Sequence, residues 1–201
     1  LFNPSSIAVV GASKAPGKIG NAIIVNLLNS GYGGNVYPVN PGEKEIEGLA
    51  CYSSVLDIAG DIDLAVISVP ARLVLNAAEE CGKAGVKNLI VVSAGFKEVG
   101  AEGLEMEKKL ISTCQEYGMR LLGPNVVGLM DTHTPLNASF ANAFPKKGEI
   151  AFLSQSGAML VAILDWSISI GLGFSKIVSL GNKGDLSEID FIKHAANDPN
   201  T

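Results

Sequence analysis

The 201-residue sequence predicts an α/β fold built on a parallel, doubly wound sheet. Short runs rich in Val and Ile are apolar throughout, as in strands covered on both faces, and amphipathic helical stretches separate them. A glycine-rich turn joins the first such run to the first helix, which predicts a ligand at the carboxyl ends of the strands. With 47% hydrophobic and 17% charged residues, the chain is too apolar for disorder and sufficient for a core.

Residues 1–130 are expected to form one complete domain with five parallel strands. The expected strands are 7–10, 35–39, 64–69, 88–93 and 120–122, and the helices between them are 18–30, 73–84 and 104–117. The second helix follows Pro70 closely, and proline suits the start of a helix because its fixed φ is already helical.

Residues 131–148 are expected to be a connector, because the stretch "THTPLNASFANAFPKK" has no periodicity and contains two prolines. Beyond it the α/β pattern restarts. The expected elements are strands 149–153 and 174–179 and helices 158–170 and 189–197. Two strands with two helices seldom make a stable sheet, so we interpret residues 149–201 as the start of a second domain in a truncated protein.

Charge and cysteine usage exclude several classes of function. The net charge of −5 argues against a nucleic-acid partner, because affinity for phosphate backbones comes from clustered Lys and Arg. Cys51, Cys81 and Cys114 are at least thirty residues apart, which fits neither a zinc site nor a disulfide framework, so we expect reduced thiols and no metal site. The sequence has no membrane-length apolar run and no signal pattern, which predicts a cytoplasmic protein without a membrane partner.

The first strand, turn and helix lie in "SIAVVGASKAPGKIGNAIIVNLLNSG", residues 6–31. A dinucleotide fingerprint has the form G-x-G-x-x-G, with a carboxylate at the end of the second strand to bind the ribose. Here the glycines are Gly11, Gly17 and Gly20, and Asn40 stands where the carboxylate belongs. The sequence therefore departs from the NAD fingerprint at both points.

The features that bind phosphate remain. Gly11 permits close backbone approach, Ser13 offers a hydroxyl, and the helix after it offers free N–H groups at its positive end. Lys44 follows the second strand and is placed to meet a second phosphate. These features indicate coenzyme A, whose phosphates are separated, rather than NAD; the alternative is a tight turn without a ligand.

A second strand, turn and helix occur in "FLSQSGAM". The flanks of Ser156 do not match the G-x-S-x-G elbow of hydrolases, and His133 and His194 are interpreted as structural or surface residues. Ser156 and Gly157 instead predict an anion site at a helix N-terminus. The loop "SLGNKGDL" either lines the same cleft or forms a surface turn.

Six motifs in order resemble the NDP-forming acyl-CoA synthetases. That family includes the ADP-forming acetate–CoA ligases, which are related to the succinyl-CoA synthetase α subunit. The motifs are "VVGAS", "VYPVNP", "DLAVISVPA", "VVSAGFKEVG", "LLGPNVVG" and "FLSQSGAM". The resemblance covers nearly the whole chain and implies a Rossmann-like CoA-binding domain followed by the start of a flavodoxin-like domain.

The resemblance also implies roles for particular residues. The CoA site would comprise the following residues: Gly11, Ser13, Lys14, Gly20, Lys44, Val69, Pro70, Ser93, Ala94 and Gly95. Asn125 would direct its amide toward the active centre, and Ser156 and Gly157 would face a phosphohistidine. Many relatives have a cysteine where this chain has Val126.

The implied reaction joins acetate and CoA with ATP, through an acyl phosphate and a phosphohistidine, and yields acetyl-CoA, ADP and phosphate. In relatives the histidine lies beyond the point that matches Thr201, so we expect no catalytic residue here and no activity from the chain alone. ATP or ADP and Mg²⁺ would bind an ATP-grasp subunit or fused domain. A small carboxylic acid would be the substrate, and the assembly would be oligomeric. Two alternatives stay open. The chain could be a regulatory region of a protein lysine acetyltransferase, or it could be an NAD-dependent oxidoreductase, although Asn40 in place of the ribose carboxylate argues against the second.

Overall fold

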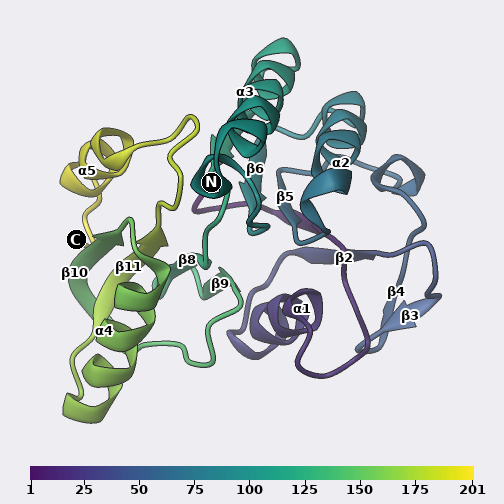
Figure 1. Ribbon diagram of the computed structural model, residues 1–201. Coiled ribbons are helices and arrows are strands. Elements are labelled where there is room, and N and C mark those ends of the chain that lie inside the picture. The colour runs from purple at the N-terminus through teal and green to yellow at the C-terminus, as the bar shows by residue number, and fades with distance from the viewer.

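Two separate β-sheets form the framework of the computed structural model, which describes residues 1–201 (Figure 1). The first sheet contains five strands in the order β2-β1-β5-β6-β7, and all of its pairings are parallel. The second contains four strands in the order β10-β11-β8-β9 and mixes parallel and antiparallel pairings. None of the helices is both long and apolar enough to cross a membrane.

The first sheet confirms the five strands and three helices expected before residue 130. Its strands are β1 (Ser6–Val10), β2 (Asn35–Val39), β5 (Leu64–Ile67), β6 (Asn88–Val91) and β7 (Arg120–Leu122). Its helices are α1 (Ile19–Asn29), α2 (Ala71–Lys83) and α3 (Ala101–Glu116). Four short elements lie in the loops: β3 (Glu45–Ile46), β4 (Leu49–Ala50), and the 3₁₀ turns η1 (Val55–Asp57) and η2 (Lys97–Val99).

The side chains of β1 explain why its sequence is apolar at every position. Ile7 and Val9 belong to the core on the α1 side, whereas Ala8 and Val10 belong to the core beneath α2 and α3. Successive side chains of a strand point to opposite faces. Because helices cover both faces, each face needs its own apolar side chains, which is the sandwich that Figure 1 shows.

The second sheet corrects the expected connector. Its strands are β8 (Gly128–Asp131), β9 (Leu136–Ser139), β10 (Lys147–Ser154) and β11 (Phe174–Ser179), and its helices are α4 (Gly157–Ile170) and α5 (Glu188–Ala196). The sequence predicts no strand in the connector at residues 131–148, whereas β9 lies inside it. Its sequence, LNAS, has no strand pattern of its own; β9 forms by pairing with β8 and by packing against α1.

The strand expected at Glu149–Leu153 is confirmed as part of the separate second sheet. The two sheets nevertheless share one core: Ile23 of α1 and Leu136 of β9 belong to the same apolar cluster. The side chain of Asn26 donates hydrogen bonds of 2.9 Å to the oxygen of Ser139, the last residue of β9, and of 2.8 Å to the oxygen of Ala141. The expected domain limits at residues 130 and 149 stay a prediction.

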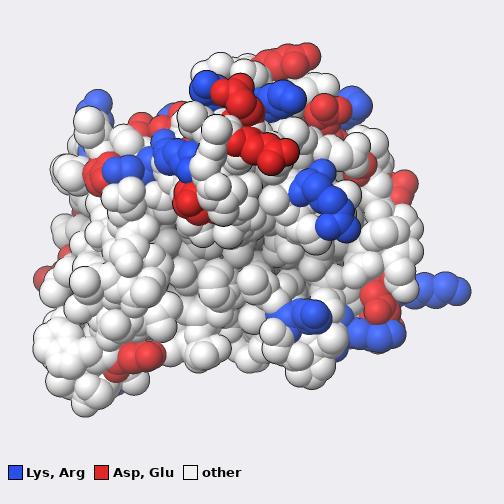
Figure 2. Space-filling view, in the orientation of Figure 1, with Lys and Arg blue, Asp and Glu red and all other residues white.

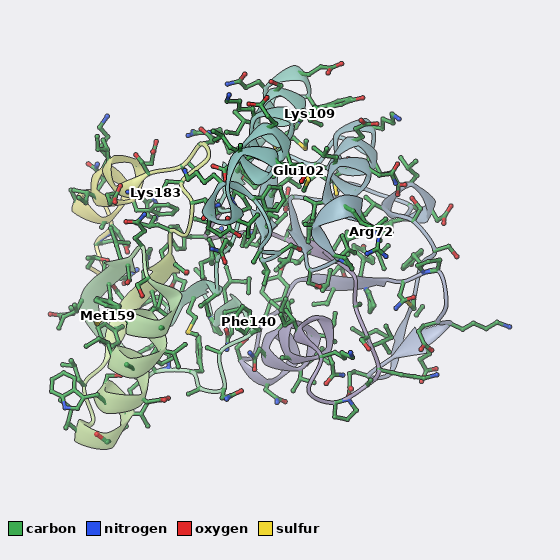
Figure 3. The ribbon with its side chains drawn as sticks, viewed as in Figure 1. Arg72, Glu102, Lys109, Phe140, Met159 and Lys183 are labelled. Atoms are coloured by element: carbon green, nitrogen blue, oxygen red, sulfur yellow. The ribbon has the colours of Figure 1, made fainter.

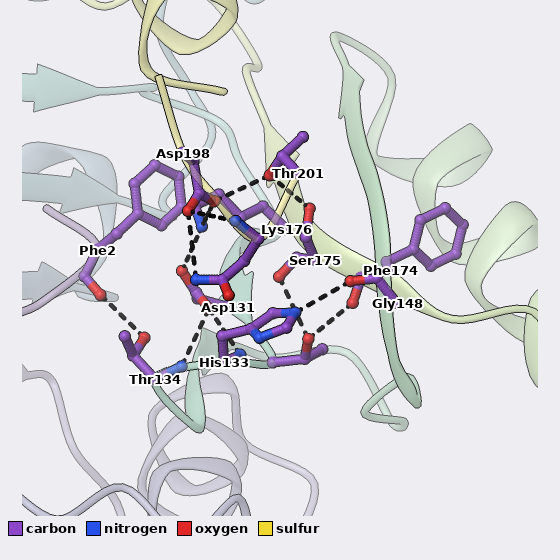
Figure 4. A network of polar contacts seen from close by, with 12 residues as sticks. Phe2, Asp131, His133, Thr134, Gly148, Phe174, Ser175, Lys176, Asp198 and Thr201 are labelled. Atoms are coloured by element: carbon purple, nitrogen blue, oxygen red, sulfur yellow. Dashed lines mark hydrogen bonds and ion pairs between the residues drawn. The ribbon is translucent and has the colours of Figure 1, made fainter. Parts of the chain in front are cut away.

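A buried polar network joins β8, β11 and the C-terminal residues (Figure 4). Lys176 on β11 is 4% exposed, and its Nζ lies 2.8 Å from an oxygen of Asp131 and contacts Asp198. His133 contributes to the same region through Nε2, which lies 3.0 Å from the Gly148 oxygen. Burial makes this network sensitive to the loss of any one charge.

Candidate functional site

The glycine-rich turn after β1 brings three segments into close contact. Gly11 has φ +89°, and a Cβ there would lie 2.9 Å from Val69 Cγ1. A Cβ on Gly20 would lie only 2.0 Å from the Gly11 oxygen. These two predicted residues therefore allow the start of α1 to approach both β1 and the turn after β5.

The N-terminus of α1 is open to an anion. Lys18 is the N-cap but makes no side-chain capping bond, and the first turn has no acidic residue. Ser13 lies in the turn before it, where its Oγ accepts a 3.1 Å hydrogen bond from Ala15 N. Uncapped N–H groups at the positive end of a helix are suited to bind a phosphate.

Asn40 fixes the end of β2 to the glycine-rich turn. Its Nδ2 donates to the Ala12 oxygen at 2.7 Å, and its Oδ1 accepts from Gly42 N at 2.8 Å. An aspartate could not make the first of these bonds, because a carboxylate only accepts. Asn40 stands at the position of the ribose carboxylate in a dinucleotide fingerprint, and here its side-chain amide has a structural role.

The two lysines of the predicted CoA site differ in their surroundings. Lys14 forms a 2.8 Å ion pair with Glu43, whereas Lys44 is exposed and forms none. No carboxylate of the protein therefore competes with an anionic ligand for the Lys44 side chain.

The turns after β5 and β6 lie against each other at the same edge of the sheet. Ser93 Oγ donates to the Val69 oxygen at 2.5 Å, and Gly95 N donates to Glu98 Oε1 at 2.6 Å. A Cβ on Gly95 would lie 2.9 Å from Ala71 Cβ. The Ser93 hydroxyl and the Gly95 amide bond within the protein, whereas the backbone N–H groups of Val69, Ser93 and Ala94 make no hydrogen bond and are free to meet a ligand.

The N-terminus of α4 forms the second predicted site. Ser156 is the N-cap, and its Oγ accepts from Met159 N at 3.2 Å. A Cβ on Gly157 would lie 2.8 Å from Val127 Cγ2, so glycine lets α4 begin directly against the β7–β8 loop. The histidines interpreted as structural or surface residues have these contacts: His194 stacks on Phe2 with ring centroids 4.8 Å apart, and His133 Nε2 lies 3.0 Å from the Gly148 oxygen.

Asn125 lies between the two predicted sites, in the left-handed region with φ +63°. Its backbone N donates to the Ser93 oxygen at 3.1 Å. Its Nδ2 lies 3.4 Å from Asn182 Oδ1 in the loop after β11. The loop "SLGNKGDL" therefore contacts Asn125, but none of its residues lines the cleft described below.

Asn182 belongs to a polar cluster that sequence analysis missed. It is 6% exposed, and its Nδ2 donates to Glu98 at 2.6 Å and to Glu107 at 2.8 Å. Lys97 Nζ lies 3.1 Å from Glu107. Burial alone would raise the pKa of Glu98, but hydrogen bonds from Asn182 and the Gly95 amide outweigh it and lower that pKa. The cluster fixes the turn after β6 to the second sheet.

A cleft of about 890 Å³ brings the two predicted groups together. Five predicted residues line it: Ser93, Ala94, Asn125, Ser156 and Gly157. Ile19, at the start of α1, and Phe140, which is labelled in Figure 3, also line it. Figure 2 shows that uncharged residues cover most of the middle of this face. The glycine-rich turn and Lys44 do not line this cleft.

Both parts of the chain match known families. A CoA binding domain matches residues 5–132, and a succinyl-CoA ligase like flavodoxin domain matches residues 147–201. The chain is 51% identical to the acetate–CoA ligase [ADP-forming] I of Archaeoglobus fulgidus, and it covers 29% of that protein. It is 47% identical to the α subunit of the acetate–CoA ligase [ADP-forming] I of Pyrococcus furiosus, and it covers 44% of that subunit.

A solved structure shows the same architecture. The dinucleotide forming acetyl-coenzyme A synthetase 1 of Ca. Korarchaeum cryptofilum, in complex with phosphate and ADP, matches the whole chain with a TM-score of 0.97 and 48% identity. The chain covers 43% of that structure, so it spans less than half the length of each of these relatives. Both domain matches and this level of identity show that the chain belongs to the NDP-forming acyl-CoA synthetase family.

Proposed function

We propose that this chain is the CoA-binding portion of an ADP-forming acid–thiol ligase. The complete protein would join acetate, or another small carboxylic acid, to CoA at the expense of ATP. The observation that carries this proposal is the N-terminus of α1, which has no side-chain cap, together with Asn40 at the position of the ribose carboxylate. Lys44, which is exposed and has no ion pair, follows the same strand as Asn40. Relatives named as ADP-forming acetate–CoA ligases support the reaction class.

We assign the CoA phosphates to the glycine-rich turn and to Lys44. Ser13 and the first turn of α1 provide a hydroxyl and free N–H groups, and Lys44 provides a charge without an internal partner. The turns around Val69–Pro70 and Ser93–Gly95 would carry the rest of the cofactor toward the cleft.

We assign the phosphoryl group of the reaction to the other wall of the cleft. Asn125 offers a side-chain amide there, and the start of α4 at Ser156 and Gly157 offers N–H groups and a positive helix end. One cleft would then hold both the thiol end of CoA and the acyl phosphate, which is the proximity that acyl transfer requires.

The remaining components belong outside this chain. ATP or ADP and Mg²⁺ would bind an ATP-grasp domain or subunit, which would be the main partner in an oligomeric assembly. The relative in complex with phosphate and ADP supports a nucleotide as reactant. The phosphohistidine and its supporting glutamate would follow the last residue of this sequence.

Calorimetric titration of the 201-residue chain with CoA and with NAD tests the proposal. We expect CoA to bind more tightly than NAD. Lys44→Ala should weaken CoA binding by about 1–3 kcal/mol, because it removes a charged partner of a phosphate. Lys109→Ala, which removes an exposed and unpaired lysine on α3, serves as the control and should leave the affinity unchanged. Tighter binding of NAD than of CoA would contradict the proposal.

A second experiment tests whether the reaction needs parts of the protein outside this chain. The 201-residue chain with ATP, magnesium, acetate and CoA should make no acetyl-CoA, and addition of the remaining α portion and the nucleotide-binding partner should restore the activity. Ser156→Asp should then impair the restored enzyme, because its carboxylate would repel the phosphoryl group. Stable phosphorylation of His194 in the 201-residue chain would show that the catalytic centre is elsewhere.

A further inference from the structure

The unpaired positive charges of the molecule are unevenly placed. Seven of the fifteen Lys and Arg side chains take part in ion pairs, which leaves eight without a carboxylate partner. Three of these eight follow the strands β1, β2 and β5: Lys18, Lys44 and Arg72. These strands are neighbours in the order β2-β1-β5, so their carboxyl ends lie together around the glycine-rich turn. In a chain of net charge −5, such a group of unpaired cations indicates an anionic ligand.

Arg72 is the second residue of α2 and is exposed, with no hydrogen bond or ion pair to its guanidinium. The N-cap of α2 is Pro70, which makes no side-chain capping bond, and the first turn has no acidic residue to attract the guanidinium. Figure 3 shows Arg72 at the end of α2 that is nearer to α1. Its charge is therefore available at the carboxyl edge of the sheet.

The turn that leads to Arg72 touches the glycine-rich turn directly. Ser68 Oγ lies 3.2 Å from the Val10 oxygen and 3.3 Å from the Gly11 oxygen. A Cβ on Gly11 would lie 2.9 Å from Val69 Cγ1. Arg72 follows Val69 by three residues, in the first turn of α2.

In the strand order, Lys44 belongs to the opposite side of the glycine-rich turn from Arg72. It follows β2, which pairs with the other edge of β1, and the Asn40–Ala12 hydrogen bond fixes that strand end to the glycine-rich turn. In dinucleotide folds the diphosphate lies at the first helix and the adenosine ribose lies near the end of the second strand. The ribose 3′-phosphate of CoA would then lie on the Lys44 side, and the β5 side would face the diphosphate.

We propose that Arg72 binds the diphosphate of CoA, across the glycine-rich turn from Lys44, which binds the 3′-phosphate. This assignment rests on the proposed function, because it places a further residue in the same CoA site. A guanidinium is suited to the role: its planar fork donates two parallel hydrogen bonds to phosphate oxygens and keeps its charge at every physiological pH.

The two phosphate groups can be separated by titrating the 201-residue chain with CoA and with dephospho-CoA, which lacks the 3′-phosphate. Arg72→Gln should weaken both ligands by the same factor, about 10-fold or more, as expected for a charged hydrogen bond. Lys44→Gln should weaken CoA and leave dephospho-CoA nearly unchanged. Lys109→Gln is the control for general charge effects and should change neither affinity.

Arg72→Lys adds a conservative variant, which keeps the charge but loses the fork and should recover only part of the affinity. It also replaces Arg72→Gln if circular dichroism shows that the glutamine variant does not fold. A loss confined to CoA would place Arg72 at the 3′-phosphate and overturn the assignment, as would unchanged affinity for both ligands. If the unaltered chain binds neither ligand, the proposed function itself fails, whatever Arg72 does.

Discussion

Replacing Lys176 by Met should cost about 3–5 kcal/mol of unfolding free energy, the usual effect of removing one partner from a buried ion pair. Lys176 is 4% exposed, and its Nζ bridges Asp131, which is 1% exposed, and Asp198 (Figure 4). Methionine fills most of the same volume, so the cost comes from leaving two carboxylates without their cation rather than from an empty space.

The pH dependence of this loss follows from the pKa shifts of the network. Burial lowers the pKa of Lys176, but its hydrogen bonds with Asp131 and Asp198 outweigh burial and raise it. The Lys176 hydrogen bond lowers the pKa of Asp198. A carboxyl group whose pKa is lowered on folding stabilises the fold at pH values above its unfolded pKa, and this stabilisation is lost as the pH falls. A lysine whose pKa is raised on folding stabilises the fold at pH values below its unfolded pKa, and this stabilisation is lost as the pH rises. The stabilisation is therefore greatest between about pH 4 and pH 10.

Urea unfolding followed by circular dichroism gives the magnitude. Lys176→Met should lower the urea midpoint at pH 7 with an unchanged slope, and the deficit should shrink only below about pH 4, where the lowered pKa of Asp198 ceases to stabilise the fold. Lys183→Met is the matched control: its 2.8 Å pair with Glu188 is partly exposed, so the loss should stay within about 1 kcal/mol. Equal losses in the two variants, or a deficit that grows in acid, would refute the reasoning.

Two further predictions concern other parts of the chain. Asn40→Asp should destabilise the protein by about 1–3 kcal/mol, because the backbone oxygen of buried Ala12 loses its donor, and calorimetry should show no gain in NAD affinity. Iodoacetamide at pH 8 should alkylate Cys51 alone in the folded protein, because burial raises the pKa of Cys81 and of Cys114 to about 12; mass spectrometry that finds either buried thiol modified without urea would contradict this.

The first sheet could be predicted from the sequence because local patterns determine it. Each strand is an apolar run long enough to identify, and the helices between them are amphipathic. The strands β8 and β9 escaped prediction for a physical reason: they are short, and their pairing with β11 and contact with α1 are tertiary interactions that no local pattern encodes.

The candidate site likewise has a part that local sequence predicts and a part that depends on tertiary contacts. The roles of Gly11 and Gly20 follow from turn geometry, which sequence spacing reveals. The cluster of Asn182, Glu98 and Glu107 could not be found, because its members lie 75 and 84 residues apart and meet only in the fold. The ion pair between Lys14 and Glu43 could not be predicted either, so the sequence alone did not show that Lys14 is paired and Lys44 is not.

Hydrogen–deuterium exchange of the 201-residue chain, with and without saturating CoA, tests the central claim most directly, because it locates the bound cofactor. The account predicts slower exchange of amides in residues 11–20, around the glycine-rich turn and the start of α1, and in the turn at residues 93–96. NAD at the same concentration should protect these segments much less. Protection confined to the start of α4, or equal protection by NAD, would contradict the assignment of this edge of the first sheet to CoA.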